Sequence, residues 1–413
     1  MTGRGPNGAA ATTPPSKPRT KSLSDKKEPR DETKLVSGGR DPHANFGIVN
    51  PPVYHASTVL TRTLAEWRAR DPMNDIVYGR VGTPTQRALE EAVALVEGGD
   101  RAIATASGLG AITVALTSFT KAGDHILMTD SAYFPARAFC NNVLAKYGVE
   151  TTFYDPQIGG GIAELIQDNT TIVYTEAPGS LTFEMQDIPA IAEAAHARGA
   201  IVMHDNTWGT PLFLKSFEKG IDVSIHAATK YIVGHSDAML GILVTKDEHF
   251  ETLFKGFRSS GQHAAPDDCY LALRGLRTMG VRLKQHQANA TTLAHWLEAR
   301  PEVGQVLYPA LESHPGHELW KRDFLGATGL FSIILDRHYD DDALGAMLDH
   351  LDLFAMGASW GGYESLILPG APPRTATKWE PAGTLLRLHV GLEHSDDLIA
   401  DLEAGFARLK AAV

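Results

Sequence analysis

Two residues that could do covalent chemistry follow separate apolar runs of the sequence. Asp205 comes directly after the run Ala200–His204, and Lys230 lies just beyond the run Asp222–Ala228. In open parallel sheets, ligands bind outside the carboxyl ends of the strands, so two such ends bring a carboxylate and an amine to one site. A lysine in a pocket loses hydration, which lowers the pKa of its amine and frees the lone pair to attack a carbonyl group. Taken alone, the pair also fits an ordinary salt bridge or a solvated lysine.

An anion site and a flat aromatic surface are predicted nearby. Ser107-Gly-Leu-Gly110 precedes the apolar helical run Ala111–Phe119, and backbone N–H groups at such a helix start bind phosphate. The glycines begin like a dinucleotide fingerprint, but Thr113 stands where the third glycine would be, which argues against a nicotinamide oxidoreductase. Tyr133 follows another strand end and could stack on a ring, or it could be a half-buried core aromatic.

Two arginines are candidates for binding anions. Arg80 lies in Tyr78-Gly-Arg80, a loop ahead of the predicted helix Thr85–Leu95, and Arg387 is the one cation of an apolar strand run. A cation in such a run needs an anionic partner or an exposed face, and a guanidinium group can hold a carboxylate by two hydrogen bonds. The sequence leaves open whether Arg387 binds a substrate or a structural partner.

No metal site is expected. The seventeen histidines include no helical His-Glu-x-x-His pattern, and the two cysteines, Cys140 and Cys269, cannot form a four-thiolate site or a disulfide framework. We therefore interpret the histidines as core or solvent-facing residues.

The elements that must position these residues alternate between short strands and helices. Strands are predicted at 124–129, 171–175, 200–204, 222–226 and 240–245, and the helix after Asp187 has Pro189 in its first turn and Gly199 beyond its end. This alternation predicts an α/β fold with right-handed crossovers and a largely parallel sheet. From residue 262 onward, a long helix over 271–297, strands at 330–335 and 385–390, and helices at 341–351 and 396–409 predict a smaller α+β domain.

Composition limits the classes of protein that remain. With 43% apolar and 21% charged residues, the 413-residue chain can bury a large core, and no run is long enough to span a membrane. Residues 1–34 carry eight Lys or Arg and four Asp or Glu, five prolines and no aromatic residue, so we expect a disordered basic tail. The rest of the chain is more acidic than the overall charge of −11, which disfavours nucleic acid or anionic membrane as partners. We expect a cytoplasmic protein.

From about Leu35 to the C-terminus, the sequence resembles the Cys/Met-metabolism family of pyridoxal-phosphate enzymes. The most specific stretch is Asp222-Val-Ser-Ile-His-Ala-Ala-Thr-Lys-Tyr-Ile-Val-Gly-His-Ser-Asp237. Ser359-Trp-Gly-Gly-Tyr-Glu-Ser365 looks like the β-lyase branch, because Trp360 stands where the γ-branch usually carries leucine. Glu176-Ala-Pro-Gly-Ser180 also looks like the β-lyase form, because it lacks the asparagine that is common after this proline in the γ-branch. The resemblance implies the aspartate-aminotransferase-like fold (fold type I), with an arm at 35–75, a cofactor domain at 76–261 and a C-terminal domain at 262–413.

The resemblance also implies roles for single residues, with pyridoxal 5'-phosphate as cofactor. Lys230 would form the Schiff base, Asp205 would hold the pyridine nitrogen, and Tyr133 would stack on the ring. The backbone of Gly108 and Leu109 and the hydroxyl of Thr229 would bind the phosphate. Ser107-Gly-Leu109 stands where related β-lyases often have Cys-Gly-Ala, but the N–H of Leu109 remains available. Tyr78 and Arg80 would bind the phosphate of a neighbouring subunit's cofactor. Arg387 would bind the substrate carboxylate, and Ser359 and Trp360 would form the loop beside it.

The activity implied is carbon–sulfur β-elimination from a small amino acid. L-cystathionine would give homocysteine, pyruvate and ammonia, a step toward methionine, with cystine, cysteine and other cysteine S-conjugates as further substrates. The assembly implied is a homotetramer that shares active sites between subunits. A γ-lyase or γ-synthase of the same family is the alternative. A cofactor-sensing regulator is a non-enzymatic rival, and the joint presence of Lys230, Asp205 and Arg387 argues against it.

Overall fold

The computed structural model describes residues 28–412. The chain divides into a unit of residues 1–30 and a compact unit of residues 31–413, and all described helices and strands lie in the second. The expected tail of residues 1–34 therefore falls mostly outside the described residues. Its expected end at residue 34 is too late, because a helix already begins at Asp31. Helix α1 (Asp31–Ser37) includes the last four tail residues, because Leu35 is buried and Asp31 Oδ2 accepts a hydrogen bond from Lys215 Nζ at 2.8 Å.

A seven-stranded, mostly parallel sheet organises the larger part of the chain. Its strand order is β1-β7-β6-β5-β4-β2-β3, and only β7 runs antiparallel to its two neighbours. The five strands predicted between residues 124 and 245 all join this sheet. The strands are β1 (Arg101–Thr105), β2 (His125–Thr129), β3 (Glu150–Tyr154), β4 (Thr170–Glu176), β5 (Ile201–Asp205), β6 (Val223–His226) and β7 (Gly241–Thr245).

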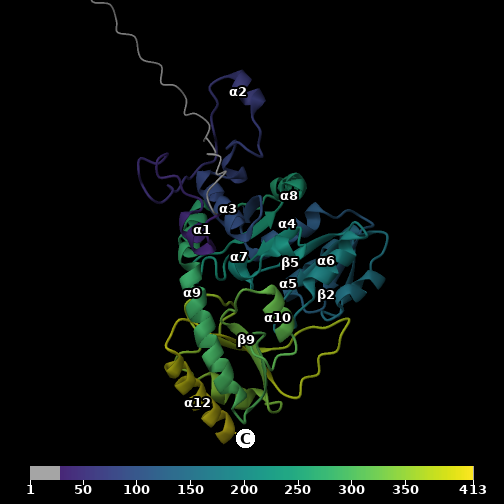
Figure 1. Ribbon diagram of the computed structural model, residues 1–413, viewed down its shortest axis with the longest axis vertical. Helices are drawn as coiled ribbons and strands as arrows, with labels where there is room; N and C mark the ends of the chain where they lie inside the picture. The colour runs from purple at the N-terminus through teal and green to yellow at the C-terminus, as the bar shows by residue number, and fades with distance from the viewer. Residues whose placement is uncertain (1–27, 413) are drawn as a thin grey trace, which may run out of the picture. The chain divides into compact units, whose positions relative to one another are not determined.

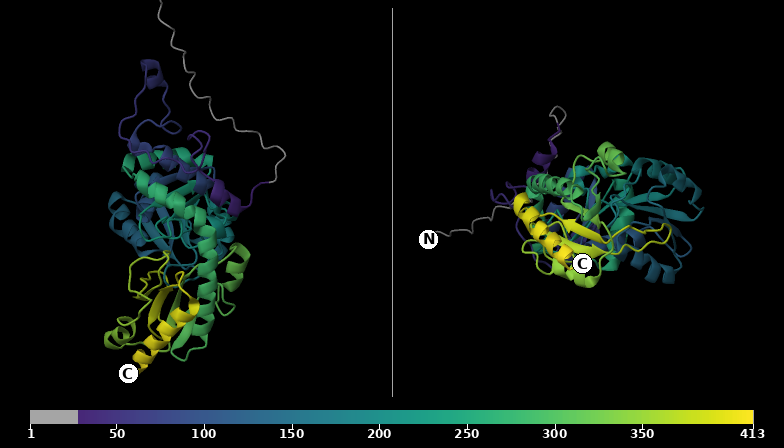
Figure 2. Two further views of the ribbon diagram at one scale, coloured as in Figure 1. Left: turned by 90° about the vertical axis from the view of Figure 1, so that its left-hand side faces the viewer. Right: turned by 90° about the horizontal axis from the view of Figure 1, so that it is seen from below.

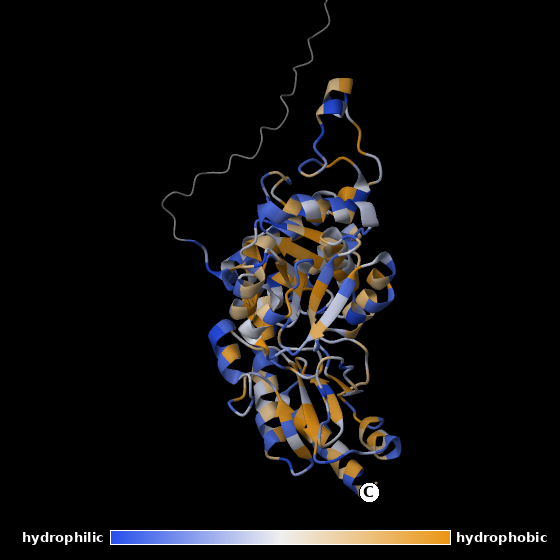
Figure 3. Cartoon of the chain, turned by 90° about the vertical axis from the view of Figure 1, so that its right-hand side faces the viewer, coloured by the Kyte–Doolittle hydropathy of each residue, from blue (hydrophilic) through white to orange (hydrophobic). Residues whose placement is uncertain are grey.

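Helices cover both faces of this sheet (Figure 1). Alternate strand residues pack into separate cores: Ile103 and Leu243 contact the side of α4 (Gly108–Ser118), α5 (Phe134–Asn142) and α8 (Asp247–Ser260). Ala104 and Val244 belong to the opposite core, formed with α3 (Pro84–Glu97) and α9 (Pro266–Glu298). Strands β2, β5 and β6 are buried along almost their whole length, and Figure 3 shows much of the sheet in the colour of hydrophobic residues, which is typical of a parallel sheet between helix layers.

Helix α6 (Ile188–His196) follows its sequence signals closely. Asp187 Oδ1 accepts a hydrogen bond from the N–H of Ala190, Pro189 occupies the first turn, and Gly199 has a φ of +74° just beyond the end. The apolar stripe is buried against β4 and β5, so the strand–helix–strand unit places Asp205 at the carboxyl edge of the sheet.

A second sheet of four antiparallel strands, in the order β10-β11-β9-β8, forms the C-terminal part. The expected boundary at residues 261 and 262 falls between α8 and α9, and the 33-residue helix α9 runs from the large sheet to the small one (Figure 2). The other elements here are β8 (Val303–Leu307), α10 (His317–Asp323), β9 (Leu330–Leu335), α11 (Asp341–Leu348), β10 (Leu366–Gly370), β11 (Leu385–His389) and α12 (Ser395–Ala411).

Two short helices and four 3-10 turns complete the described chain: α2 (Leu64–Ala69), α7 (Thr210–Phe213), Gly79–Val81, Leu144–Tyr147, Gly159–Glu164 and Ser216–Lys219. Across residues 28–412, no helix combines the length and apolar character needed to cross a lipid bilayer.

Candidate functional site

The site is built where β5 and β6 end side by side. Asp205 is the last residue of β5 and pairs in register with Ile225 of β6, and Lys230 follows β6 by one short turn. The Lys230 N–H donates to the carbonyl oxygen of Ala227 at 3.0 Å, which closes that turn. Asp205 and Lys230 thus lie at the same edge of the sheet, as the sequence predicts.

Lys230 faces the small sheet's loops. Its Nζ donates a hydrogen bond to the hydroxyl of Ser359 at 2.6 Å and lies 5.4 Å from the ring centroid of Trp360. Burial, and then the positive charge of Arg387, lowers the pKa of Lys230 to about 8, while the charge of Asp205 acts in the opposite direction. The amine is therefore far easier to deprotonate than a surface lysine.

Arg387 lies on β11 and reaches the same loop. Its Nη2 donates to the backbone oxygen of Ser359 at 3.1 Å, so the loop residue contacts both cations through different atoms. Burial lowers the pKa of Arg387. No carboxylate of residues 28–412 makes an ion pair with Arg387, so the structural salt bridge that the sequence left open is not formed within this part of the chain. A partly buried guanidinium group without an anion is suited to bind a carboxylate from solution.

Asp205 is held with one oxygen occupied. Its Oδ1 accepts hydrogen bonds from the N–H of Thr207 at 3.0 Å and from the hydroxyl of Thr207 at 2.5 Å. Burial raises the pKa of Asp205. A buried carboxylate without a paired cation favours a cationic N–H partner, which a protonated pyridine nitrogen provides.

Tyr133 lies next to this carboxylate, at the start of α5. The tyrosine is 45% exposed, and burial followed by the nearby charges of Asp205 and Glu176 raises the pKa of its hydroxyl. This partial exposure agrees with both interpretations that the sequence left open, a ring-stacking tyrosine and a half-buried core aromatic.

The N-terminus of α4 offers a close-fitting anion cradle. Ser107 caps the helix by accepting the N–H of Gly110 at 3.0 Å, and within the described chain the N–H groups of Gly108 and Leu109 have no acceptor. A Cβ on Gly108 would lie 2.5 Å from the Cβ of Ala227, so only glycine lets this helix start approach the turn before Lys230. Free N–H groups at a helix N-terminus beside a lysine of lowered pKa fit a phosphorylated aldehyde cofactor.

Three predicted residues are placed differently from the rest. The hydroxyl of Thr229 donates to the carbonyl oxygen of Leu240 at 3.2 Å and accepts from its N–H, so it is engaged with the backbone here. Tyr78 is 44% exposed, and Arg80 Nη1 donates to the carbonyl oxygen of Arg258 on α8 at 2.7 Å. Among residues 28–412, no hydrogen bond or ion pair joins Tyr78 or Arg80 to the groups around Lys230.

An aromatic cluster and helix α9 support the loop of Ser359 and Trp360. Tyr231 contacts Trp360, with ring centroids 5.5 Å apart, and His389 Nε2 lies 3.1 Å from the Gly361 N–H. On α9, Arg282 donates to the carbonyl oxygen of Tyr231 at 2.9 Å, and one turn later His286 bonds the carbonyl oxygen of Val390, just after β11.

The sequence of residues 32–407 matches the family described as Cys/Met metabolism PLP-dependent enzyme. The chain belongs to this family. It is 44% identical over 388 residues to the cystathionine beta-lyase MetC of Escherichia coli, covering 92% of this chain and 98% of the relative. It is also 43% identical over 395 residues to an L-alanine/L-glutamate racemase of Wolbachia pipientis, with 92% and 98% covered. The crystal structure of metB from Corynebacterium glutamicum superposes with a TM-score of 0.85 at 31% identity, covering 92% and 98% of the two chains.

Membership confirms the fold type I architecture and pyridoxal 5'-phosphate as the cofactor of this Cys/Met metabolism enzyme. It also confirms the expected kinship with β-lyases. The residues around Lys230 fit the cofactor on their own chemistry: a readily deprotonated amine, a carboxylate for a ring nitrogen, an aromatic side chain and a backbone phosphate cradle.

The sequence interpretation gave no role to Glu176 or Thr207. Glu176 ends β4 in register with Asp205, and its Oε2 accepts the N–H of Tyr133 at 2.7 Å. Glu176 carries the same signal that singled out Asp205, a carboxylate at the end of an apolar strand run, and that signal could have found it.

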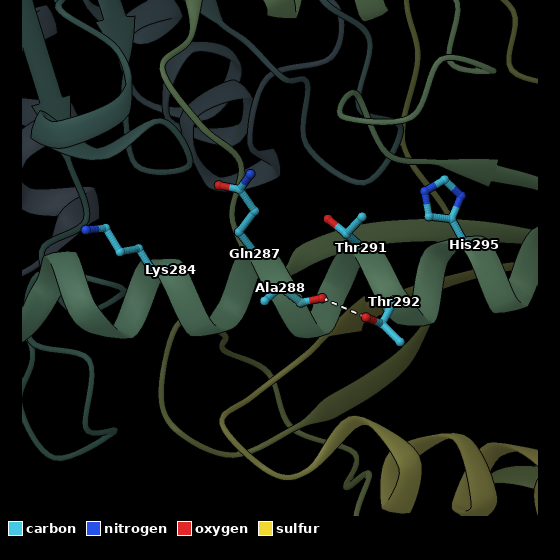
Figure 4. A pocket seen from close by; sticks show the side chains of 6 residues that line it. All are labelled: Lys284, Gln287, Ala288, Thr291, Thr292 and His295. Atoms are coloured by element: carbon cyan, nitrogen blue, oxygen red, sulfur yellow. Dashed lines mark hydrogen bonds between the residues drawn. The ribbon is translucent and has the colours of Figure 1, made fainter.

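Other concave or histidine-rich regions do not compete with this site. A shallow hollow of about 460 Å³ lies along α9 and is lined by polar side chains such as Lys284 and Gln287 (Figure 4). Within the part of the chain that the structure describes, no group of three or more His, Cys, Asp or Glu could hold a metal ion.

Proposed function

We propose that the protein is a carbon–sulfur β-lyase that cleaves L-cystathionine to homocysteine, pyruvate and ammonia. The observation that carries the proposal is the convergence of Lys230 and Arg387 on Ser359, which sets an amine base beside a guanidinium group that makes no ion pair within residues 28–412. The similarity to the cystathionine beta-lyase MetC of Escherichia coli supports this choice of substrate.

The chain's residues divide the work between binding and proton transfer. Arg387 binds the substrate α-carboxylate and orients the Cα–H bond toward Lys230, a positioning effect. The Lys230 amine, with its pKa lowered to about 8, takes the Cα proton as general base. The protonated amine can then donate a proton as general acid in a later step of the reaction. The loop of Ser359 and Trp360 covers the amine and excludes water.

The cofactor, when bound, supplies an electron sink for the charge that develops at Cα. We assign Asp205 to the pyridine nitrogen, Tyr133 to the ring face, and the N–H groups of Gly108 and Leu109 to the phosphate. Thr229 would add its hydroxyl only by releasing the Leu240 carbonyl oxygen, so its contribution to phosphate binding is the smaller one.

We further propose a homotetramer in which Tyr78 and Arg80 complete the phosphate site of a neighbouring subunit. The segment before them exposes large apolar side chains, such as Phe46 (99% exposed) and Leu60 (88% exposed), which a monomer would leave in water. Figure 1 shows α2 at the end of a loop that extends from the helices.

A subunit-mixing experiment tests this assembly. Arg80→Ala and Lys230→Ala should each be inactive alone. When the two variants are unfolded and refolded together, half of the dimers should contain one variant of each kind, and each of these has one intact shared site out of two. The mixture should therefore regain about a quarter of the parent activity. A mixture that stays inactive, or a fully active monomer by light scattering, would contradict the shared site.

One assay separates the candidate activities. The purified protein is incubated with L-cystathionine and the keto acid is identified: pyruvate supports the β-lyase, and α-ketobutyrate would indicate the γ-lyase alternative. Parallel incubation with L-alanine, followed by chiral chromatography, tests for the racemase activity of the Wolbachia relative. Racemisation faster than pyruvate release would overturn the proposal. Cystine, cysteine and another S-conjugate complete the substrate panel.

A further inference from the structure

A second carboxyl group lies beside Asp205 in this site. Glu176 is the last residue of β4, directly opposite Asp205 on β5. Its Oε2 accepts the backbone N–H of Tyr133 at 2.7 Å, and Gln186 Nε2 donates to its backbone oxygen at 2.6 Å. The side chain of Glu176 thus connects the strand that ends beside Asp205 to the start of α5, where Tyr133 stands.

Glu176 has no compensating positive charge. Within residues 28–412, no lysine, arginine or histidine makes an ion pair with it, and the charged group that acts on it most is Asp205. Burial, and then the charge of Asp205, raises the pKa of Glu176 well above its ordinary value. Two neighbouring carboxyl groups at a desolvated strand edge do not both ionise, because each charge disfavours the other.

The two groups have different hydrogen-bond partners. Asp205 accepts two hydrogen bonds from Thr207, which stabilise its ionised form, whereas within residues 28–412 the side chain of Glu176 accepts a hydrogen bond only from the Tyr133 N–H. The single negative charge therefore belongs on Asp205 and the proton on Glu176.

We propose that Glu176 is an uncharged positioning residue, which anchors Tyr133 through its backbone and leaves Asp205 as the only negative charge facing the cofactor ring. The proposal rests on the proposed assignment of Tyr133 and Asp205 to the cofactor. An ionised Glu176 would add a second negative charge beside Asp205 and would compete with it for a proton on the bound ring.

Substitution of Glu176 by an uncharged isostere separates its charge from its hydrogen bond. Glu176→Gln keeps an oxygen for the Tyr133 N–H, so the holoenzyme should keep its absorbance band and bind pyridoxal 5'-phosphate within about threefold of the parent. Glu176→Ala loses the acceptor and should weaken cofactor binding about tenfold or more, because a partly buried N–H is left without a partner. Glu193→Gln, an exposed glutamate on α6, is the matched control.

Two results would overturn the proposal. If Glu176→Gln weakens binding as much as Glu176→Ala, or does not fold, the ionised carboxylate is required. If Glu176→Ala matches the parent, the hydrogen bond to Tyr133 has no role. Failure of the underlying assignment is recognised separately, because Asp205→Ala and Tyr133→Ala would then bind pyridoxal 5'-phosphate as tightly as the parent.

The pH dependence of thermal stability gives a second readout on the holoenzyme. Because folding raises the pKa of Glu176 above 4.5, its stabilising contribution is present below that pH and is lost as the pH rises toward the folded-state value. Glu176→Gln lacks this loss, so above about pH 5 its Tm relative to the parent should rise by about 2 °C per pH unit until Glu176 ionises in the folded parent. A Tm difference that is constant with pH would show that Glu176 is already ionised.

Discussion

Gly361 lies directly against Lys230: a Cβ on Gly361 would stand 2.9 Å from the Cα of Lys230. The φ of Gly361 is +85°, in the left-handed region that favours glycine. Gly361 follows Trp360, and its N–H bonds His389 on the strand that carries Arg387. The close approach of these two backbones therefore brings the covering loop onto the amine.

We predict that Gly361→Ala impairs turnover far more than it impairs stability. The methyl group must push the loop off Lys230, which breaks the hydrogen bond from Lys230 to Ser359 and should lower kcat/KM by about 30-fold or more. Gly123→Ala is the matched control, because Gly123 has a φ of +90° and open space around its Cβ position. Both variants share the backbone strain of about 1 kcal/mol, so equal kinetic effects would rule out crowding at Lys230 as the cause.

The guanidinium group of Arg387 should be needed for its shape as well as its charge. Arg387→Lys keeps the charge but loses the two-pronged donor, and Arg387→Ala leaves the substrate carboxylate without a cation. Loss of such a pair costs about 2 to 5 kcal/mol, or roughly 30-fold to several-thousand-fold in kcat/KM. The cofactor absorbance should survive both changes. Bleaching of the cofactor, or an efficiency within about threefold of the parent for Arg387→Ala, would make the arginine structural.

The pH dependence of cofactor binding should follow Lys230. The attacking amine must be neutral, so the rate at which the cofactor-free protein takes up pyridoxal 5'-phosphate should rise with pH and level off above a midpoint near 8. Because the charge of Arg387 lowers the pKa of Lys230, Arg387→Met should move that midpoint upward. Stopped-flow absorbance measures both curves, and a midpoint that stays fixed in the variant would show that the two cations do not interact.

Replacement of the lysine itself should remove the covalent link. Lys230→Ala is expected to lose the absorbance at about 420 nm that is general for a protonated imine of this cofactor, together with nearly all turnover. The spectrum of the purified variant, compared with the parent at equal cofactor content, gives the answer directly. A retained band would place the link on another lysine.

Truncation from the N-terminus should have a sharp boundary. Removal of residues 1–27 takes away a basic, proline-rich segment without aromatic residues, so we expect the Tm and the kinetics to stay near those of the full chain. Removal of residues 1–34 also deletes Asp31, whose carboxylate pairs with Lys215, and leaves Leu35 outside a helix. The longer deletion should lower the Tm by several degrees, and equal Tm values for the two truncations would show that α1 adds no stability.

The fold could be predicted from the sequence where local signals agree with tertiary packing. Helix α6 has its cap, its proline, its apolar stripe and its final glycine, and the apolar strands are buried on both faces. Strands β3 and β8 gave no such signal, because three residues of each are at least partly exposed and polar residues interrupt them. Their place depends on pairing with distant strands, which periodicity does not encode.

The site could be predicted only in part for a related reason. Asp205, Lys230 and Arg387 have side chains whose type and position already indicate chemistry. The contacts of Ser359 with Lys230 and Arg387 link the end of one sheet to a loop of the other, and only the folded chain shows them. The charge state of Glu176 likewise depends on Asp205, a residue on the neighbouring strand.

Helix α9 holds both ends of this arrangement within a single turn, at Arg282 beside Tyr231 and at His286 beside Val390. Because one turn of helix has a fixed rise, α9 helps to fix the distance between the Lys230 amine and the Arg387 guanidinium group. Every α-amino acid has the same spacing between its Cα and its carboxylate, so this fixed distance suits all of them equally. Discrimination between sulfur-containing amino acids must then come from side chains that face the far end of the substrate, and substitutions there can change the substrate without disturbing the proton-transfer machinery.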